Sequence, residues 1–164
     1  VVDVGSGAGF PGVPLAICLP ETHFILMDSL GKRVEFLSDV ISALQLNAEA
    51  VHLRAEDGAR RPEYRERFDI AVARAVAPMN LLAEYLLPFV RVGGRMLAYK
   101  GPALAEELVQ AQNALDILGG SVECDAPVSL PGRDWEHRLA VIAKIAPTPE
   151  KYPRRAGKPE KKPL

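Results

Sequence analysis

The chain has 164 residues, of which 48% are hydrophobic and 25% are charged, and its net charge is −1. This length suits one domain with a sizeable core, and the composition is that of an ordinary globular protein. No apolar run approaches the roughly 20 residues of a membrane helix, and no secretory signal pattern is present. The cysteines and histidines stand apart from one another, which predicts neither disulfides nor a metal site. We expect a cytoplasmic protein that has no membrane partner and that buries Cys18 and Cys124 as small apolar residues.

Short apolar runs alternate with helical patterns along the chain. Strands are predicted at residues 1–4, 23–28, 48–55, 69–75 and 94–100, and a final antiparallel pair at 121–130 and 138–145. Helices are predicted at residues 12–19, 30–46, 79–88 and 102–118. Repeated strand, helix and strand imply a parallel sheet with right-handed crossovers and helices on both faces. The expected fold is therefore α/β, a mostly parallel, doubly wound sheet with an antiparallel strand at one end.

Four glycines follow the first predicted strand, in "VVDVGSGAGFPG". Residues without side chains permit tight turns and positive φ, and they let a ligand approach the backbone. The segment reads as GxGxG from Gly5 and also as GxGxxG from Gly7, which is the dinucleotide fingerprint. Because Gly5 is the glycine that touches the strand, the first reading is favoured.

Polar residues near the ends of other strands complete a candidate site. Asp28 ends the second strand, where a carboxylate can bind both hydroxyls of an adenosine ribose or can cap the next helix. In "RAED", the backbone of Ala55 and the side chain of Glu56 can contact an adenine, although such a turn is more often solvated. Arg74 and Lys100 end the fourth and fifth strands. A role at the site is favoured for Arg74 over an ion pair with Glu56, and both readings stay open for Lys100.

The end of the chain differs in composition from the rest. Residues 151–164 carry six Lys or Arg and one Glu, a net charge of +5, so that residues 1–150 carry −6. Five prolines in residues 146–164 predict an extended tail, or an arm that docks without entering the core. We therefore divide the chain into a domain at 1–146 and a basic, Pro-rich tail at 147–164. Such a tail is typical of contact with nucleic acid, and equally of a solvated terminus.

Several of these stretches together resemble one family, the ribosomal small-subunit methyltransferase G (GidB) family. The resemblance runs over essentially the whole chain and is carried by "DVGSGAGFPGVPLAI", "MDSLGKRVEFL", "RAED", "FDIAVARAVAPMNLLAEYLLPFVRVGGRMLAYKG" and "RLAVIAKIAPTPEKYPRRAGKPEKKPL". It implies a Rossmann-like class I fold that uses S-adenosyl-L-methionine (SAM) and methylates N7 of a guanine in the decoding-region loop of bacterial 16S rRNA. Family members carry a helical segment before the loop, and this sequence starts without Met inside a strand. We therefore expect an N-terminally truncated member, acting as a monomer on 16S rRNA or the small ribosomal subunit.

The resemblance also implies site residues. The SAM contacts are Gly5, Phe10, Ala55, Glu56 and Arg74, to which the loop and the strand end add Gly7 and Asp28. The predicted RNA contacts are Arg138, Lys151, Tyr152, Arg154, Arg155, Lys158, Lys161 and Lys162, with Tyr152 stacking on a base. Deleting residues 151–164 is expected to weaken RNA binding and to leave SAM binding nearly intact.

The implied chemistry needs little from the protein besides geometry. Guanine N7 carries a free lone pair, so no proton has to be removed before it attacks a methyl group. Positioning alone is worth roughly 7–11 kcal/mol at best, and we expect no essential general base, with Arg74 and Lys100 as the candidate catalytic residues. Two other classes stay open: an NAD(P)-dependent oxidoreductase, from the literal GxGxxG, and a non-catalytic RNA-binding module, from the basic tail.

Overall fold

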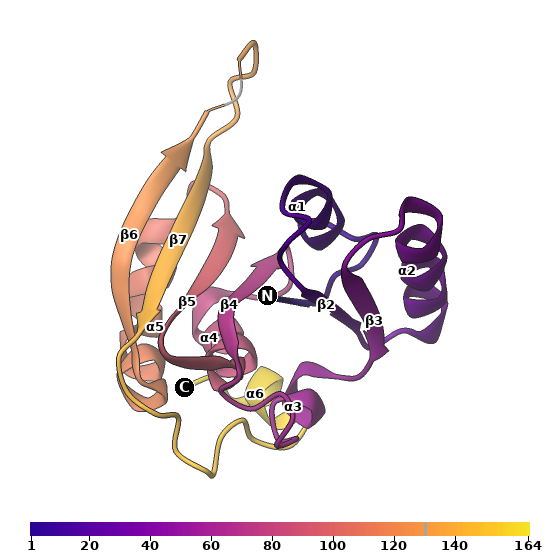
Figure 1. The fold of residues 1–164 in the computed structure, drawn as a ribbon. Coiled ribbons are helices and arrows are strands. Elements are labelled where there is room, and N and C mark those ends of the chain that lie inside the picture. Colours follow the sequence, from indigo (N-terminus) through magenta and orange to yellow (C-terminus); the bar gives the residue numbers. More distant parts are fainter. Residues whose placement is uncertain (130) are drawn as a thin grey trace.

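The computed structural model describes residues 1–129 and 131–164, and these form one sheet flanked by helices (Figure 1). The strands are β1 (Val2–Val4), β2 (Phe24–Asp28), β3 (Ala48–His52), β4 (Phe68–Arg74), β5 (Val90–Lys100), β6 (Gly120–Val128) and β7 (His137–Lys144). The helices are α1 (Gly12–Cys18), α2 (Gly31–Leu44), α3 (Ala55–Gly58), α4 (Met79–Leu86), α5 (Leu104–Leu118) and α6 (Lys158–Lys161), with a 3-10 turn η1 (Leu87–Phe89). Each predicted strand and helix is present with shifted ends, and residue 130 of the strand predicted at 121–130 lies outside the described residues.

The strand order is β3-β2-β1-β4-β5-β7-β6, which confirms the doubly wound topology. Strands β1 to β5 pair in parallel, and the chain crosses from β3 at one edge to β4 on the other side of β1. β7 runs antiparallel between β5 and β6, so the reversed strand lies one place in from the edge. The change of direction beside β1 creates a crevice beyond the carboxyl ends of β1 and β4, where ligands of such sheets bind.

The sheet is covered on both faces, and β2 shows how its sequence produces this. Phe24 and Leu26 pack with Leu37 of α2 in a smaller core, whereas Ile25 and Met27 face the main core. Successive side chains of a strand point to opposite faces, so an unbroken apolar strand supplies both cores at once. None of the described helices is long and apolar enough to cross a membrane.

The two cysteines correct one expectation, because both are exposed. Cys18 is the last residue of the short helix α1, whose buried face is formed by Gly12 and Ala16. Cys124 lies on the edge strand β6, most of whose residues are exposed or half-buried. The expected burial fails because neither a helix end nor an edge strand is covered on all sides.

The C-terminal arm, defined here as residues 147–164, docks against the domain. It leaves the sheet after β7 and runs beneath it to α6, which lies beside α4 (Figure 1). The expectation that it stays outside the core is wrong at Tyr152, which is 8% exposed and belongs to the main core. Buried in this way, Tyr152 has no free face for stacking on a base, which corrects its predicted RNA contact.

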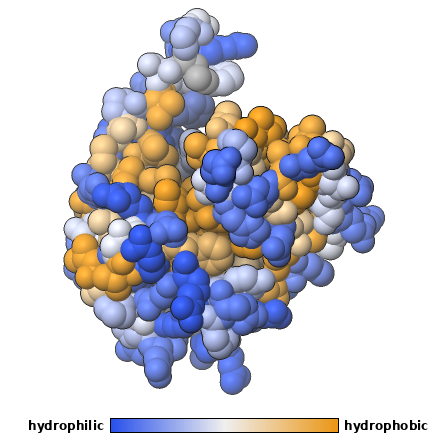
Figure 2. Space-filling view, in the orientation of Figure 1, coloured by the Kyte–Doolittle hydropathy of each residue, from blue (hydrophilic) through white to orange (hydrophobic). Residues whose placement is uncertain are grey.

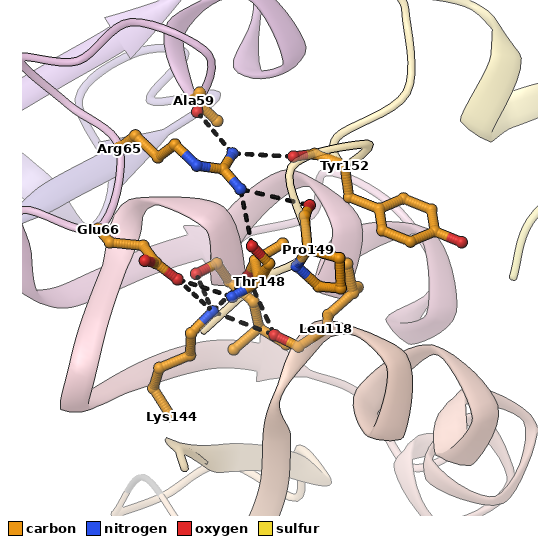
Figure 3. Close-up of polar contacts among 9 residues, drawn as sticks. Ala59, Arg65, Glu66, Leu118, Lys144, Thr148, Pro149 and Tyr152 are labelled. Atoms are coloured by element: carbon orange, nitrogen blue, oxygen red, sulfur yellow. Dashed lines mark hydrogen bonds and ion pairs between the residues drawn. The ribbon is translucent and has the colours of Figure 1, made fainter. Parts of the chain in front are cut away.

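Buried Lys144 holds the start of the C-terminal arm (Figure 3). Its Nζ donates to the carbonyl oxygens of Leu87 and Leu118, each at 3.0 Å, and to Oγ1 of Thr148. Glu66 Oε1 lies 3.3 Å from the same nitrogen. Burial lowers the pKa of Lys144 to about 8, against the opposing effect of Glu66. The ammonium group thus joins β7 to two helix ends and to the arm.

Two arginines fix the next part of the arm. Arg65 donates to the carbonyl oxygens of Tyr152 and Thr148, each at 2.8 Å (Figure 3). Arg154 contacts Glu84 of α4 through its backbone N–H at 2.7 Å and through Nη2 at 2.5 Å. Glu84 is fully buried, and a buried carboxylate requires such a partner. Arg154, predicted as an RNA contact, is therefore an anchor of the arm.

Replacing Lys144 by Met will lower the free energy of unfolding at pH 7 by about 1–3 kcal/mol, because buried carbonyls lose their donor. Folding lowers the pKa of Lys144 from 10.5 to about 8, so the unfolded state binds more protons between these pH values. The wild type must then gain stability relative to Lys144→Met as pH rises through that window, by up to about 3 kcal/mol. Urea unfolding at several pH values measures this, and a constant difference would contradict it.

Candidate active site

The glycine loop between β1 and α1 has a backbone that side chains would disturb. Gly5 and Gly7 have φ of +74° and +61°, in the left-handed region that favours glycine. A Cβ on Gly5 would lie 2.9 Å from Cγ2 of Val76. The N–H groups of Gly5 and Ser6 both donate to the carbonyl of Met27, at 2.9 and 3.1 Å. The loop is thereby fastened to β2 and brought close to the segment that follows β4.

Asp28 supports the same loop from the end of β2. Its Oδ2 accepts a hydrogen bond from the N–H of Gly7 at 2.9 Å, and its Oδ1 accepts one from Leu30 at 3.0 Å. Arg33 lies 3.4 Å from Oδ2, and the side chain of Asp28 is almost fully buried. The carboxylate therefore orders both the loop and the entry to α2, and it also lines the cleft described next.

An acidic cleft of about 430 Å³ opens beyond the carboxyl ends of β1 and β2. It is lined by Val4, Gly5, Met27, Asp28, Ser29, Leu53, Arg54, Ala55, Glu56, Val76, Tyr85 and Glu160. Four predicted cofactor contacts meet here: Gly5, Asp28, Ala55 and Glu56. Three carboxylates around one cleft favour a ligand that brings hydrogen-bond donors or positive charge.

An apolar cavity of about 540 Å³ adjoins the acidic cleft. It is lined by Arg74, Ala75, Val76, Ala77, Leu82, Tyr99, Lys100, Gly101, Val128, Trp135, His137 and Arg138. Figure 2 shows hydrophobic residues gathered around the hollow between the β6–β7 hairpin and the lobe that carries α1. Val76 is common to both linings, so the two spaces adjoin at this residue.

Arg74 and Phe10, both predicted to bind the cofactor, lie outside the lining of the acidic cleft. The guanidinium carbon of Arg74 lies 5.3 Å from the centre of the Phe10 ring, a cation–π contact. Within the described residues Arg74 forms no ion pair, so the alternative of a pair with Glu56 is not what the structure shows. Arg74 instead faces the apolar cavity, and Gly7 supports Asp28 without lining the cleft.

The side chain of Lys100 is held by two hydrogen bonds. Its Nζ donates to the carbonyl of Ala77 at 2.7 Å and to Oε2 of Glu107 at 2.5 Å. The same carboxylate oxygen accepts the N–H of Met79 at 2.8 Å. Between β4 and α4, Ala75 has φ of +56°, which is strained for a residue with a side chain. Lys100 therefore positions this loop, and its ammonium group is already paired at the wall of the apolar cavity.

Apart from Tyr152 and Arg154, which dock the arm, the predicted RNA contacts fall into two groups. The cations Lys151, Arg155, Lys158, Lys161 and Lys162 are exposed on the arm. Arg138 is half-buried at the wall of the apolar cavity, where its Nε donates to Asp125 at 2.7 Å. The first group is free to meet phosphates, whereas Arg138 already has a partner.

Asp3 and Trp135 are among the residues near the site that the sequence analysis missed. Asp3 of β1 is fully buried, and its Oδ2 accepts hydrogen bonds from Ser6 Oγ at 2.7 Å and from the N–H of Gly12 at 2.9 Å. Burial raises the pKa of Asp3 to about 6 in spite of these bonds. A charged residue inside the apolar run "VVDV" was the available signal. Trp135, 53% exposed on the β6–β7 hairpin, lines the apolar cavity, and a single aromatic residue in a loop has no periodicity to reveal it.

Comparisons with solved structures define the class of the fold. An rRNA methylase from Streptococcus thermophilus superposes with a TM-score of 0.62 at 19% identity, covering 88% of this chain and 86% of that one. Fibrillarin from Aeropyrum pernix, in complex with natively bound SAM, superposes with a TM-score of 0.64 at 16% identity, covering 87% of this chain and 65% of that one. The fold is that of the class I SAM-dependent methyltransferases.

Sequence comparisons then identify the family. Residues 1–127 match the GidB family model, rRNA small subunit methyltransferase G. The chain is 52% identical to the ribosomal RNA small subunit methyltransferase G of Alkaliphilus oremlandii and 49% identical to that of Clostridium perfringens, over 100% of this chain and 69% of each relative. The chain belongs to the rRNA small subunit methyltransferase G family. The resemblance drawn from the sequence is confirmed, and the oxidoreductase alternative is not favoured.

Replacing Asp3 by Asn will change how stability depends on pH. Folding raises the pKa of Asp3 from 3.8 to about 6, so the folded state binds more protons between these values. The free energy of unfolding of the wild type must then fall as pH rises through the window, relative to Asp3→Asn, by about 3 kcal/mol. Urea unfolding from pH 4 to pH 7 tests this, and parallel curves for the two proteins would refute it.

Proposed function

We propose that the acidic cleft binds SAM and that the chain methylates N7 of a guanine in the decoding-region loop of 16S rRNA. The observation that carries the proposal is the convergence of Asp28, Ala55 and Glu56 on one cleft beside the glycine loop. Ribose hydroxyls and an adenine amine are donors that suit these carboxylates, and a sulfonium is a cation. The pyrophosphate of NAD would meet the same negative charges, so the electrostatics of the cleft favour SAM.

The residues present fit the proposed cofactor. Asp28 would hold the ribose, as carboxylates at this strand end do, and Glu56 with the backbone of Ala55 would hold the adenine. The missing side chain of Gly5 lets Val76 pack against the loop at the lining of the acidic cleft. Bound SAM supplies a methyl group on a positively charged sulfur, and the protein supplies its orientation.

The apolar cavity is the proposed place of the target guanine. Trp135 and Tyr99 offer aromatic faces against which a base can lie. Arg74 offers a guanidinium that can donate to the guanine O6 or to a phosphate. Since N7 already carries its lone pair, these residues need only hold the base toward Val76 and the acidic cleft. Lys100 contributes by keeping the loop that carries Val76 in place.

The exposed cations of the C-terminal arm are the proposed phosphate contacts. Lys151, Arg155, Lys158, Lys161 and Lys162 lie on the surface, whereas Tyr152 and Arg154 are used to dock the arm. Arg138 would contact RNA only at the edge of the apolar cavity, beside Asp125. We also propose that the protein acts as a monomer in the cytoplasm, on the small ribosomal subunit or its rRNA.

The direct test is methylation of small subunits from a strain that lacks the modification, with labelled SAM, followed by mapping of the labelled base. Gly7→Val is expected to abolish labelling and to weaken SAM binding at least about tenfold, because a β-branched side chain does not tolerate this φ and the backbone must move away from its hydrogen bond to Asp28. Gly132→Val is the matched control, since Gly132 has φ of +75° with open space around it. Label on another base, or equal SAM affinity for both variants, would contradict the proposal.

A second test concerns RNA binding by the arm. Replacing Lys151, Arg155, Lys158, Lys161 and Lys162 together by Gln leaves the anchors of the arm in place. Each phosphate contact that is lost should reduce the slope of log affinity against log salt by about 0.7–0.9. SAM affinity should stay within about twofold, since none of these residues lines the acidic cleft. Filter binding of 16S rRNA fragments over a salt series measures the slope, and an unchanged slope would remove the arm from the RNA interface.

A further inference from the structure

The C-terminal arm reaches the acidic cleft as well as the surface. Glu160 of α6 is one of the residues that line this cleft. Its Oε1 accepts a hydrogen bond from the hydroxyl of Tyr85 at 3.3 Å, and Tyr85 lines the cleft too. A carboxylate from the far end of the chain therefore lies at the mouth of the cleft formed by β1, β2 and α3.

Glu160 is itself exposed, and its placement is held by partly buried contacts between the arm and the domain. Two neighbouring residues of α4 contact the arm. Glu84 forms an ion pair with Arg154, and the hydroxyl of Tyr85 donates a hydrogen bond to Glu160 of α6. Arg60 adds a hydrogen bond to the carbonyl of Pro153 at 2.5 Å. Since Glu84 is fully buried and Arg154 is its ion-pair partner, the arm cannot leave without stranding a buried charge.

The end of the cleft near α3 is rich in hydrogen-bond acceptors. Burial, together with the charges of Glu56 and Glu160, raises the pKa of Tyr85, so its hydroxyl keeps its proton and its bond to Glu160. Each carboxylate retains acceptor capacity that faces the cleft. An exocyclic amine carries two N–H donors, and two carboxylates at one end of a cleft can satisfy both.

We propose that Glu160 contacts the cofactor and accepts one N–H of the adenine amine, while Glu56 accepts the other. The C-terminal arm is then a wall of the cofactor site in addition to being an RNA-binding surface. This inference rests on the proposed function of the acidic cleft. It replaces the expectation that deleting residues 151–164 leaves SAM binding nearly intact.

Calorimetric titration of the full chain with two ligands tests the contact. S-adenosyl-L-homocysteine carries the amine, whereas S-inosyl-L-homocysteine has a carbonyl in its place. Glu160→Ala should weaken the adenosyl ligand roughly five- to tenfold, because a charged acceptor is lost, and should not weaken the inosyl ligand. Glu160→Gln, which keeps one acceptor oxygen, should recover part of the loss. Glu150→Ala is the control, since Glu150 is an exposed carboxylate of the same arm outside the cleft.

Two results would overturn the inference: unchanged affinity of Glu160→Ala for the adenosyl ligand, or equal weakening of both ligands, which marks a purely structural role. A chain that ends at Arg154 gives an independent check, because it keeps the Arg154–Glu84 contact and removes α6. It should lose at least as much affinity for the adenosyl ligand as Glu160→Ala does. If the wild type itself fails to bind S-adenosyl-L-homocysteine, the proposed function fails, and the two failures are thereby distinguished.

Discussion

Two buried carboxylates fix the backbone of the glycine loop, and the rest of the site is built around that backbone. Asp3 holds the loop through Ser6 and Gly12, and Asp28 holds it through Gly7. Both acids come from the first two strands of the sheet, so the sheet determines where the loop lies. Fixing the loop in this way has a cost, because burial disfavours the charged form of Asp3 and raises its pKa.

Buried charge also explains why the C-terminal arm stays against the domain. Glu84 and Lys144 are almost wholly removed from solvent, and both find part of their partners in the arm. Removing either set of partners would leave a charge in the interior, which is far more costly than losing a surface contact. A segment whose composition is typical of disorder is thus ordered by charges that the domain supplies.

The fold and part of the lining of the acidic cleft could be predicted from the sequence, because both depend on local patterns. Alternating apolar runs predict the sheet, and strand ends place Asp28 and Glu56 at one edge. The misses depend on contacts between distant segments. From the sequence, Glu160 is only one acid in a basic tail and Tyr152 is a candidate for base stacking. The residues next to them in the chain do not reveal which distant segments they contact. Glu84 was the one signal in the sequence that pointed to such a contact. An acid within "NLLAEYLLPF", on a helix that is buried nearly all round, needs a partner from another segment.

Val76, the residue shared by the linings of the two spaces, has a consequence for the range of groups that can be transferred. In the proposed function the donor carbon comes from the acidic cleft and the accepting nitrogen from the apolar cavity, so the two meet at the junction that Val76 lines. The size of the side chain at position 76 then affects how bulky an alkyl substituent on the sulfonium can be at this junction. In the proposed function, tolerance for synthetic donors larger than methyl therefore depends in part on a position that lies outside the glycine loop.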